Sequence, residues 1–165
     1  MKAAVVVANE DVQYQEIEEP KVTKGAVKIK VRYSGICGSD IPRVLNHGVH
    51  FYPIVLGHEF SGDVVEVGEG VTKVKVGDRV YGAPLLPCMK CDDCQQGNFS
   101  LCKHYSFIGS RQQGSNADYV VVPEQNAVPF DKSVSYEQGA MFEPATVAIH
   151  GVFQNDYHGG EYVAI

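Results

Sequence analysis

The 165-residue sequence lacks the run of about 18 consecutive apolar residues that a membrane-spanning helix needs. Its first apolar run, residues 3–8, is shorter than the core of a secretory signal and leads into acidic residues. An excess of basic residues is also lacking, since the net charge is −6 and the isoelectric point is about 5.4. Nucleic acids and anionic membranes require a basic face on their partner. We therefore expect a cytoplasmic protein with neither kind of partner.

Short alternating segments separated by glycine and proline make up most of the sequence, which predicts a mainly β fold with few helices. Six strands are expected, at residues 2–7, 12–17, 26–33, 62–68, 74–81 and 117–122. Gly68 and Gly70 are predicted to form a turn between two of them. Two helices are expected, at 39–45 and 135–153. Many short strands at this spacing are typical of a β-barrel or sandwich.

Five cysteines in a chain without an export signal argue against a disulfide framework. Four of them lie within 15 residues, at Cys88, Cys91, Cys94 and Cys102. Thiolates in fours at short spacing suit tetrahedral zinc better than four free thiols. An iron–sulfur cluster is the alternative, but bacterial ferredoxins place proline after the fourth cysteine, whereas here Lys103 follows. A closed four-thiolate site has no open coordination position, so we expect a structural zinc in a lobe at residues 84–105.

A second group of metal-binding residue types is spread along the chain. It consists of Cys37, His58, Glu59 and Glu143. Taken alone, each is typical of an ordinary core or surface position. Together, one thiol, one imidazole and one or two carboxylates supply three ligands and leave a position for water, which is the arrangement of a catalytic zinc.

Several motifs then occur in a fixed order, and their combination resembles the zinc-dependent medium-chain alcohol and polyol dehydrogenases over essentially the whole chain. They are Gly57-His58-Glu59 with Gly62, Val76-Gly77-Asp78-Arg79-Val80, the four-cysteine lobe and Glu143-Pro144. Within that family, Cys37-Gly-Ser-Asp and Glu143-Pro resemble the polyol branch, which includes sorbitol dehydrogenase. The segments most similar to galactitol-1-phosphate dehydrogenases are residues 39–43, 48–53, 84–88 and 107–111.

The resemblance implies a GroES-like β-barrel catalytic domain at residues 1–153 with two zinc ions, one catalytic and one structural. It also implies the oxidation of a secondary hydroxyl of a polyol or polyol phosphate, similar to galactitol 1-phosphate, with NAD(P)⁺ as the hydride acceptor. Cys37, His58 and a carboxylate would hold the catalytic zinc. Polyol enzymes of the family use the glutamate after the histidine, here Glu59, while the later Glu143 touches zinc or its water; which of the two is the third ligand stays open.

The resemblance further implies that Ser39, two residues after the cysteine, relays the hydroxyl proton toward solvent. Simple alcohol and sorbitol dehydrogenases often carry a histidine five residues after the cysteine as part of that relay. Here that position is Pro42, so the proton must leave by another route. His47 and His50 are the alternatives, unless both are plain surface histidines.

A phosphorylated substrate would need cationic side chains near the zinc. The expected substrate-binding residues are Arg43, His50, Phe107 and Arg111. Phe107 would line an apolar wall, and arginine is the usual bidentate partner of phosphate. The alternative is that both arginines are solvated or pair with Asp40 and Glu143.

A dinucleotide-binding Gly-x-Gly-x-x-Gly turn after a first strand is absent, so the cofactor-binding residues are unknown. We interpret residues 154–165 as a linker and the first strand of a truncated nicotinamide-binding domain. The chain alone is then expected to be inactive, and the choice between NAD(H) and NADP(H) stays open. A full-length parent is expected to form a homodimer or homotetramer.

Other functions fit parts of the same pattern. A sorbitol, butanediol or simple alcohol dehydrogenase is the first alternative, and a non-catalytic scaffold stabilised by zinc is the second. A zinc-free reductase of the same superfamily is a third, against which the complete set of Cys37, His58 and carboxylates argues.

Overall fold

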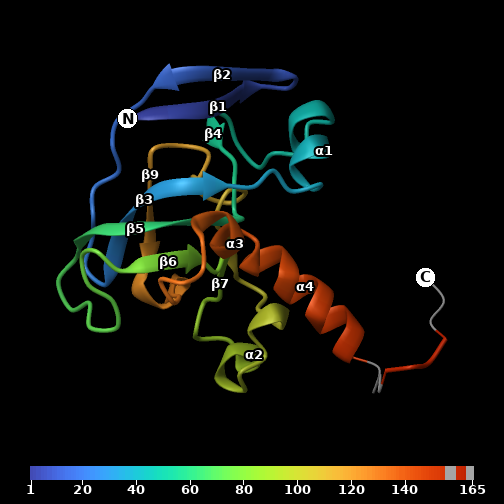
Figure 1. Cartoon of the computed structure of the whole chain (residues 1–165). Helices are drawn as coiled ribbons and strands as arrows, with labels where there is room; N and C mark the ends of the chain where they lie inside the picture. The colour runs from blue at the N-terminus through green and yellow to red at the C-terminus, as the bar shows by residue number, and fades with distance from the viewer. Residues whose placement is uncertain (155–158, 163–165) are drawn as a thin grey trace.

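Strands form most of the regular structure in the computed structural model, which describes residues 1–154 and 159–162. The largest sheet is antiparallel, with the order β10-β6-β5-β3-β9 (Figure 1). Its strands are β3 (Ala26–Ser34), β5 (Phe60–Val67), β6 (Arg79–Gly82), β9 (Tyr119–Pro123) and β10 (Ala127–Pro129). The sheet curls into a half-barrel, so the expectation of a mainly β, barrel-like fold with few helices is confirmed.

Two smaller sheets complete the β structure of the described residues. The first has the order β2-β1-β4 and lies above the half-barrel in the view of Figure 1. Its strands are β1 (Lys2–Ala8), β2 (Asp11–Glu16) and β4 (Ile54–Val55). The second sheet pairs β7 (Leu85–Leu86) with β8 (Ser106–Phe107), on either side of the cysteine lobe.

The core lies inside the half-barrel because alternate residues of its strands are apolar and face inward. In β3, Val27 and Ile29 are fully buried, and each such side chain stabilises the fold by about 1.5–3 kcal/mol. The buried members of this core are Val27, Ile29, Phe60, Val64, Val74, Val80, Ile108, Val120, Val122 and Ala127. Phe60 fits only because residue 82 is glycine: a Cβ there would lie 2.1 Å from the phenyl ring.

The helices differ from the prediction in number and in one boundary. They are α1 (Asp40–Leu45), α2 (Asp92–Gln95), α3 (Tyr136–Ala140) and α4 (Phe142–Phe153). The single helix expected at 135–153 is therefore two helices, which meet at Met141. Ser135 begins α3 with a capping box, in which it exchanges hydrogen bonds with Gln138. The expected helix at 39–45 is present as α1.

One predicted strand is largely wrong. The segment expected at 74–81 contributes only its last residues to β6, because residues 74–78 form a turn instead. Gly77 has a φ of +91° there, and the Asp78 carboxylate accepts a hydrogen bond from the Lys75 backbone N–H at 2.9 Å. A positive φ and a side chain that bonds the local backbone are features of turns.

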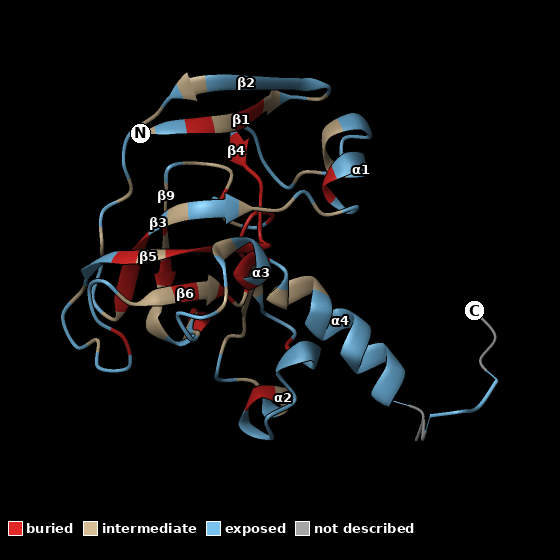
Figure 2. Cartoon of the chain, in the orientation of Figure 1, coloured by how far each residue is buried: buried red, intermediate tan, exposed pale blue. Residues whose placement is uncertain are grey.

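Helix α4 extends away from the half-barrel, and none of its residues is buried (Figures 1 and 2). Among the residues that the structure describes, no helix has the length and apolar character of a membrane span. Residues 159–162 form no strand. The predicted strand at the end of the chain otherwise falls on residues 163–165, outside the described residues, so that domain boundary stays a prediction.

Candidate metal centres

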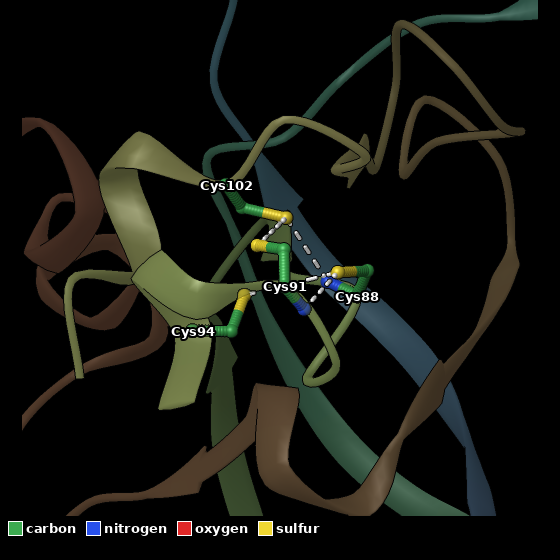
Figure 3. A group of neighbouring side chains, drawn as sticks. All are labelled: Cys88, Cys91, Cys94 and Cys102. Carbon is green, nitrogen blue, oxygen red and sulfur yellow. Dashed lines mark hydrogen bonds between the residues drawn. The ribbon is translucent and has the colours of Figure 1, made fainter. Parts of the chain in front are cut away.

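The four cysteines of the lobe converge on one point. Cys88 follows β7, Cys91 and Cys94 lie at the start and inside of α2, and Cys102 ends a 3₁₀ turn (Figure 3). Their Sγ atoms all lie within 4.8 Å of one another. The Cys88–Cys94 and Cys91–Cys102 sulfur separations are 3.9 and 4.0 Å. A zinc tetrahedron with bonds of about 2.3 Å has edges of about 3.8 Å, so the donor set fits this ion.

Backbone N–H groups of the lobe point at these sulfurs. The N–H of Cys88 donates to Cys102 Sγ at 3.2 Å, and the N–H of Cys91 donates to Cys88 Sγ at 3.4 Å. Backbone hydrogen bonds from Lys90 and Cys91 lower the pKa of the Cys88 thiol to about 6, whereas burial raises the pKa of Cys94 to about 12. Backbone N–H groups thus stabilise the thiolate form of Cys88, which is the form that binds a metal.

The second group gathers side chains from the two loops that enter α1 and β5. Cys37 lies between β3 and α1, and His58 and Glu59 lie between β4 and β5. One ligand atom from each of these three lies within 4.8 Å of the others. The backbone N–H of Gly35 donates to the Glu59 carbonyl at 2.7 Å. A Cβ at residue 35 would lie 2.4 Å from Glu59 Oε2, so only glycine lets this carboxylate reach the group.

The His58 imidazole is buried in this group and lacks a full set of partners. Its Nδ1 has no hydrogen-bond partner among the described residues and lies 3.8 Å from Asp40 Oδ1. Desolvation lowers the pKa of His58, so the ring is neutral near pH 7, the form in which histidine binds metals. An incompletely satisfied imidazole beside a thiol and a carboxylate fits a zinc ion with one open position.

Glu143 approaches the same group from the first turn of α4. Burial raises the pKa of this carboxyl, and the neighbouring Glu59 carboxylate adds to the effect. Glu143 is nevertheless not among the three residues whose ligand atoms lie within 4.8 Å of one another. The geometry therefore favours Glu59 as the third ligand and leaves Glu143 beside it.

Some of the residues expected to relay the proton or bind substrate lie near the Cys37–His58–Glu59 group, and others lie on the surface. Arg43 Nη1 donates to Ser39 Oγ at 2.6 Å and to Asp40 Oδ1 at 3.3 Å. The Phe107 ring meets the His58 ring edge to face, with centroids 5.5 Å apart. Phe107 thus lies at the group, as an apolar wall would.

Arg111, His47 and His50 are exposed. The Arg111 guanidinium lies over the Tyr105 ring at 4.7 Å, which is a cation–π arrangement. No contact between these three side chains and the Cys37–His58–Glu59 group is seen among the described residues. Their expected roles in substrate binding and proton release stay predictions.

Asp40 has a structural role at the group that the sequence did not reveal. Its carboxylate is 4% exposed, accepts the Cys37 backbone N–H at 3.1 Å and faces His58. The sequence interpretation considered this residue only as a pairing partner for arginine. Its position three residues after Cys37, at the start of a helix, was the available signal.

Comparison with known proteins agrees with the motifs. Residues 23–132 match the family described as the alcohol dehydrogenase GroES-like domain. Galactitol 1-phosphate 5-dehydrogenase of Escherichia coli (strain K12) is 48% identical over 124 residues, which cover 75% of this chain and 36% of that protein. Sorbitol dehydrogenase of Halalkalibacterium halodurans is 40% identical over 152 residues, which cover 92% of this chain and 44% of that protein.

Solved structures give the same result. The crystal structure of galactitol-1-phosphate dehydrogenase from Escherichia coli superposes with a TM-score of 0.88 and 43% identity, over 91% of this chain and 44% of that one. The structure of 2R,3R-butanediol dehydrogenase from Bacillus subtilis superposes with a TM-score of 0.86 and 39% identity, over 97% of this chain and 49% of that one. The chain thus spans less than half the length of these relatives. The resemblance inferred from the motifs is confirmed: the chain belongs to the GroES-like domain family of the alcohol dehydrogenases.

Proposed function

We propose that the chain is the zinc-binding half of a dehydrogenase that oxidises a secondary hydroxyl of a polyol or polyol phosphate, with NAD(P)⁺ as the hydride acceptor. The observation that carries the proposal is the convergence of Cys37, His58 and Glu59 on one point, beside a separate four-cysteine cluster. Relatives named for galactitol 1-phosphate, sorbitol and butanediol support the reaction class. Because the chain spans half or less of these relatives, the nicotinamide site is assigned to the rest of the protein.

The chain's own residues would divide the work of this reaction. Cys37, His58 and Glu59 would hold the ion, and Phe107 would shield one side of the imidazole from water. A bound zinc ion would polarise the substrate hydroxyl and stabilise the negative charge on its oxygen. Ser39 would accept the hydroxyl proton and pass its own to solvent, to which it is exposed. A nicotinamide cofactor held by the rest of the protein would accept the hydride.

The four-cysteine lobe would hold a second zinc with a structural role. Its four sulfurs lie within 4.8 Å of one another and would occupy all four positions of a tetrahedral ion, which leaves none for substrate. Metal content separates this reading from an iron–sulfur cluster and from free thiols. The complete protein should contain two zinc ions per chain and no iron when analysed by plasma mass spectrometry; one zinc in a fully loaded sample, or any stoichiometric iron, contradicts it.

Arg111 is the better placed of the two arginines to meet a substrate phosphate. Arg43 already donates to Ser39 and Asp40, whereas the Arg111 guanidinium is exposed over Tyr105. In the complete enzyme, Arg111→Ala should raise KM for a polyol phosphate more than KM for the unphosphorylated polyol. The difference between the two effects should correspond to a free energy of about 2 kcal/mol. Equal effects on both substrates would make Arg111 a structural residue.

An unphosphorylated polyol or diol is the second candidate substrate. It is favoured by the commitment of Arg43 to Asp40, which removes one of the two cations that a phosphate site was expected to use. Steady-state kinetics of the complete enzyme with sorbitol, butanediol and galactitol 1-phosphate decide between the two by their kcat/KM values. A complete protein that binds zinc but oxidises none of them would instead support the scaffold alternative.

A further inference from the structure

Arg43 lies in α1, six residues after Cys37, and contacts two of the residues between them. Its Nη1 donates to Ser39 Oγ at 2.6 Å and to Asp40 Oδ1 at 3.3 Å. The Arg43 side chain is 22% exposed, so most of it is packed against the protein. A single guanidinium nitrogen therefore joins the hydroxyl expected to carry the proton and a buried carboxylate.

That carboxylate is fixed on its other side to the metal-binding group. Asp40 Oδ2 accepts the Cys37 backbone N–H at 3.1 Å, and Asp40 Oδ1 lies 3.8 Å from His58 Nδ1. Asp40 is therefore hydrogen-bonded to the backbone of one proposed ligand and faces the imidazole of the other. Because Arg43 binds Asp40 and Ser39 with the same nitrogen, it holds the Ser39 oxygen at a set place relative to that group.

The bond from Arg43 also determines what the Ser39 hydroxyl can do. A hydroxyl has one O–H donor and two lone pairs, and a guanidinium can only donate. Arg43 therefore occupies one lone pair of Ser39 Oγ with a charge-assisted bond. One lone pair is left to accept a proton, and the O–H is left to donate one. Ser39 Oγ can therefore accept the substrate proton while it donates its own proton to water.

We propose that Arg43 is a positioning residue for the proton transfer and acts through the Ser39 hydroxyl, an inference that rests on the proposed dehydrogenase function. The substrate O–H bond breaks and a new O–H bond forms on Ser39 Oγ, while the original Ser39 proton passes to a water molecule. Arg43 neither gains nor loses a proton. Pro42 has no polar side-chain group that could contact the relay, and the adjacent Arg43 supplies one.

A double-mutant cycle in the complete enzyme tests this role. Arg43→Ala should lower kcat by about tenfold or more, and it should change KM for the polyol by less than about threefold. The solvent deuterium isotope effect on kcat should increase, because proton transfer becomes slower. In a Ser39→Ala background, Arg43→Ala should lower kcat no further, since the two residues act as one unit.

Three further measurements separate positioning from damage to the fold or the metal group. Arg43→Lys should recover most of kcat, because an ammonium group can donate to both Ser39 and Asp40. The visible absorption of the cobalt-substituted Arg43→Ala protein should match that of the cobalt-substituted wild type. The control Lys24→Ala breaks a surface ion pair to Glu69 of 2.8 Å and should leave kcat unchanged.

The inference is overturned by an unchanged kcat in Arg43→Ala, by losses that multiply in the double variant, or by altered cobalt bands. Failure of the proposed function is visible separately and earlier. If the wild-type complete protein oxidises no polyol with NAD⁺ or NADP⁺, the proposed function falls and this inference falls with it. An active wild type with an unaffected Arg43→Ala variant removes only the inference.

Discussion

The cysteine lobe and the Cys37–His58–Glu59 group are both built from metal-binding side chains, but the chain assembles them in opposite ways. The lobe draws its four thiols from 15 consecutive residues and needs only two short turns of helix to bring them together. The second group joins loops on two strands, β3 and β5, which pair directly in the half-barrel. A local site makes folding depend on the metal, whereas a site at a sheet rim has its geometry set by the sheet. We therefore expect metal loss at the lobe to lower the stability of the fold. Metal loss at the Cys37–His58–Glu59 group, the rim group, should instead lower activity.

The largest effect should come from Cys37→Ser in the complete enzyme. Loss of the thiolate ligand removes the ion's several kcal/mol of stabilisation of the reacting oxygen, so kcat should fall by roughly 10³-fold. The melting temperature should move by less than about 2 °C, because the sheet positions the loop without the ion. Activity and calorimetry on one sample check both. A large loss of thermal stability would show that the rim group is also structural.

Cys94→Ser should have the opposite profile. This buried thiol is a member of the sulfur tetrahedron, and metal binding at such a site contributes directly to folding. The melting temperature should fall by about 5 °C or more, with the loss of one zinc ion per chain. Ser100→Ala, on the exposed surface of the same lobe, is the matched control and should change neither quantity. Retention of both zinc ions in Cys94→Ser would contradict the assignment of the lobe.

Gly35→Ala should weaken the rim group without touching the lobe. The added Cβ would lie 2.4 Å from Glu59 Oε2, so the carboxylate must shift from its place beside Cys37 and His58. We expect roughly tenfold weaker metal binding there, measured by competition with a chromophoric chelator. Gly38→Ala, whose Cβ would meet nothing within 4 Å, is the control. Equal affinities in the two variants would exclude Glu59 as a ligand.

The smallest effect concerns the sheet that supports the rim group. Burial of Asp63 would by itself raise its pKa, but hydrogen bonds from Tyr136 and Arg32 outweigh it, so the pKa is lowered from 3.8. A lowered carboxyl pKa stabilises the fold above the unfolded-state value, and the contribution is lost as the pH falls toward the folded-state value. The stability advantage of the wild type over Asp63→Asn should therefore shrink as the pH falls below about 4. Urea unfolding at pH 7 and pH 3 measures it; an advantage independent of pH would contradict the assigned hydrogen bonds.

The sequence predicted features built from residues close together in the chain better than features that join distant segments. Alternation of apolar and polar residues identified β1, β2, β3, β5 and β9, although β2 is almost wholly exposed. The cysteine spacing predicted the lobe, since all its members are close in sequence. The strand expected at 74–81 was wrong at residues 74–78, because Val74 and Val76 alternate with lysines although the backbone turns at Gly77. Apolar alternation does not report backbone dihedral angles.

The rim group was predictable only in part. Motif order suggested Cys37 and His58, but the choice between the two glutamates depends on the approach of Glu59 to Gly35, which is a contact between two loops. The pairing of Arg43 with Ser39 and Asp40 was likewise hidden, because an arginine in a sequence does not reveal which side of a short helix it occupies. Such contacts depend on side-chain direction, which residue spacing alone leaves open.

The closeness of the four sulfurs has a consequence for handling the protein. Pairs of thiols 3.9 to 4.0 Å apart need to move only a short way to form a disulfide when an oxidant such as dissolved oxygen accepts their two electrons. Cys88, whose pKa is lowered to about 6, presents a thiolate that can begin this chemistry. A chelator that removes zinc would thus expose the lobe to oxidation as well as loosen it. Samples kept with zinc and a phosphine reductant should stay reloadable, whereas samples stripped in air should not.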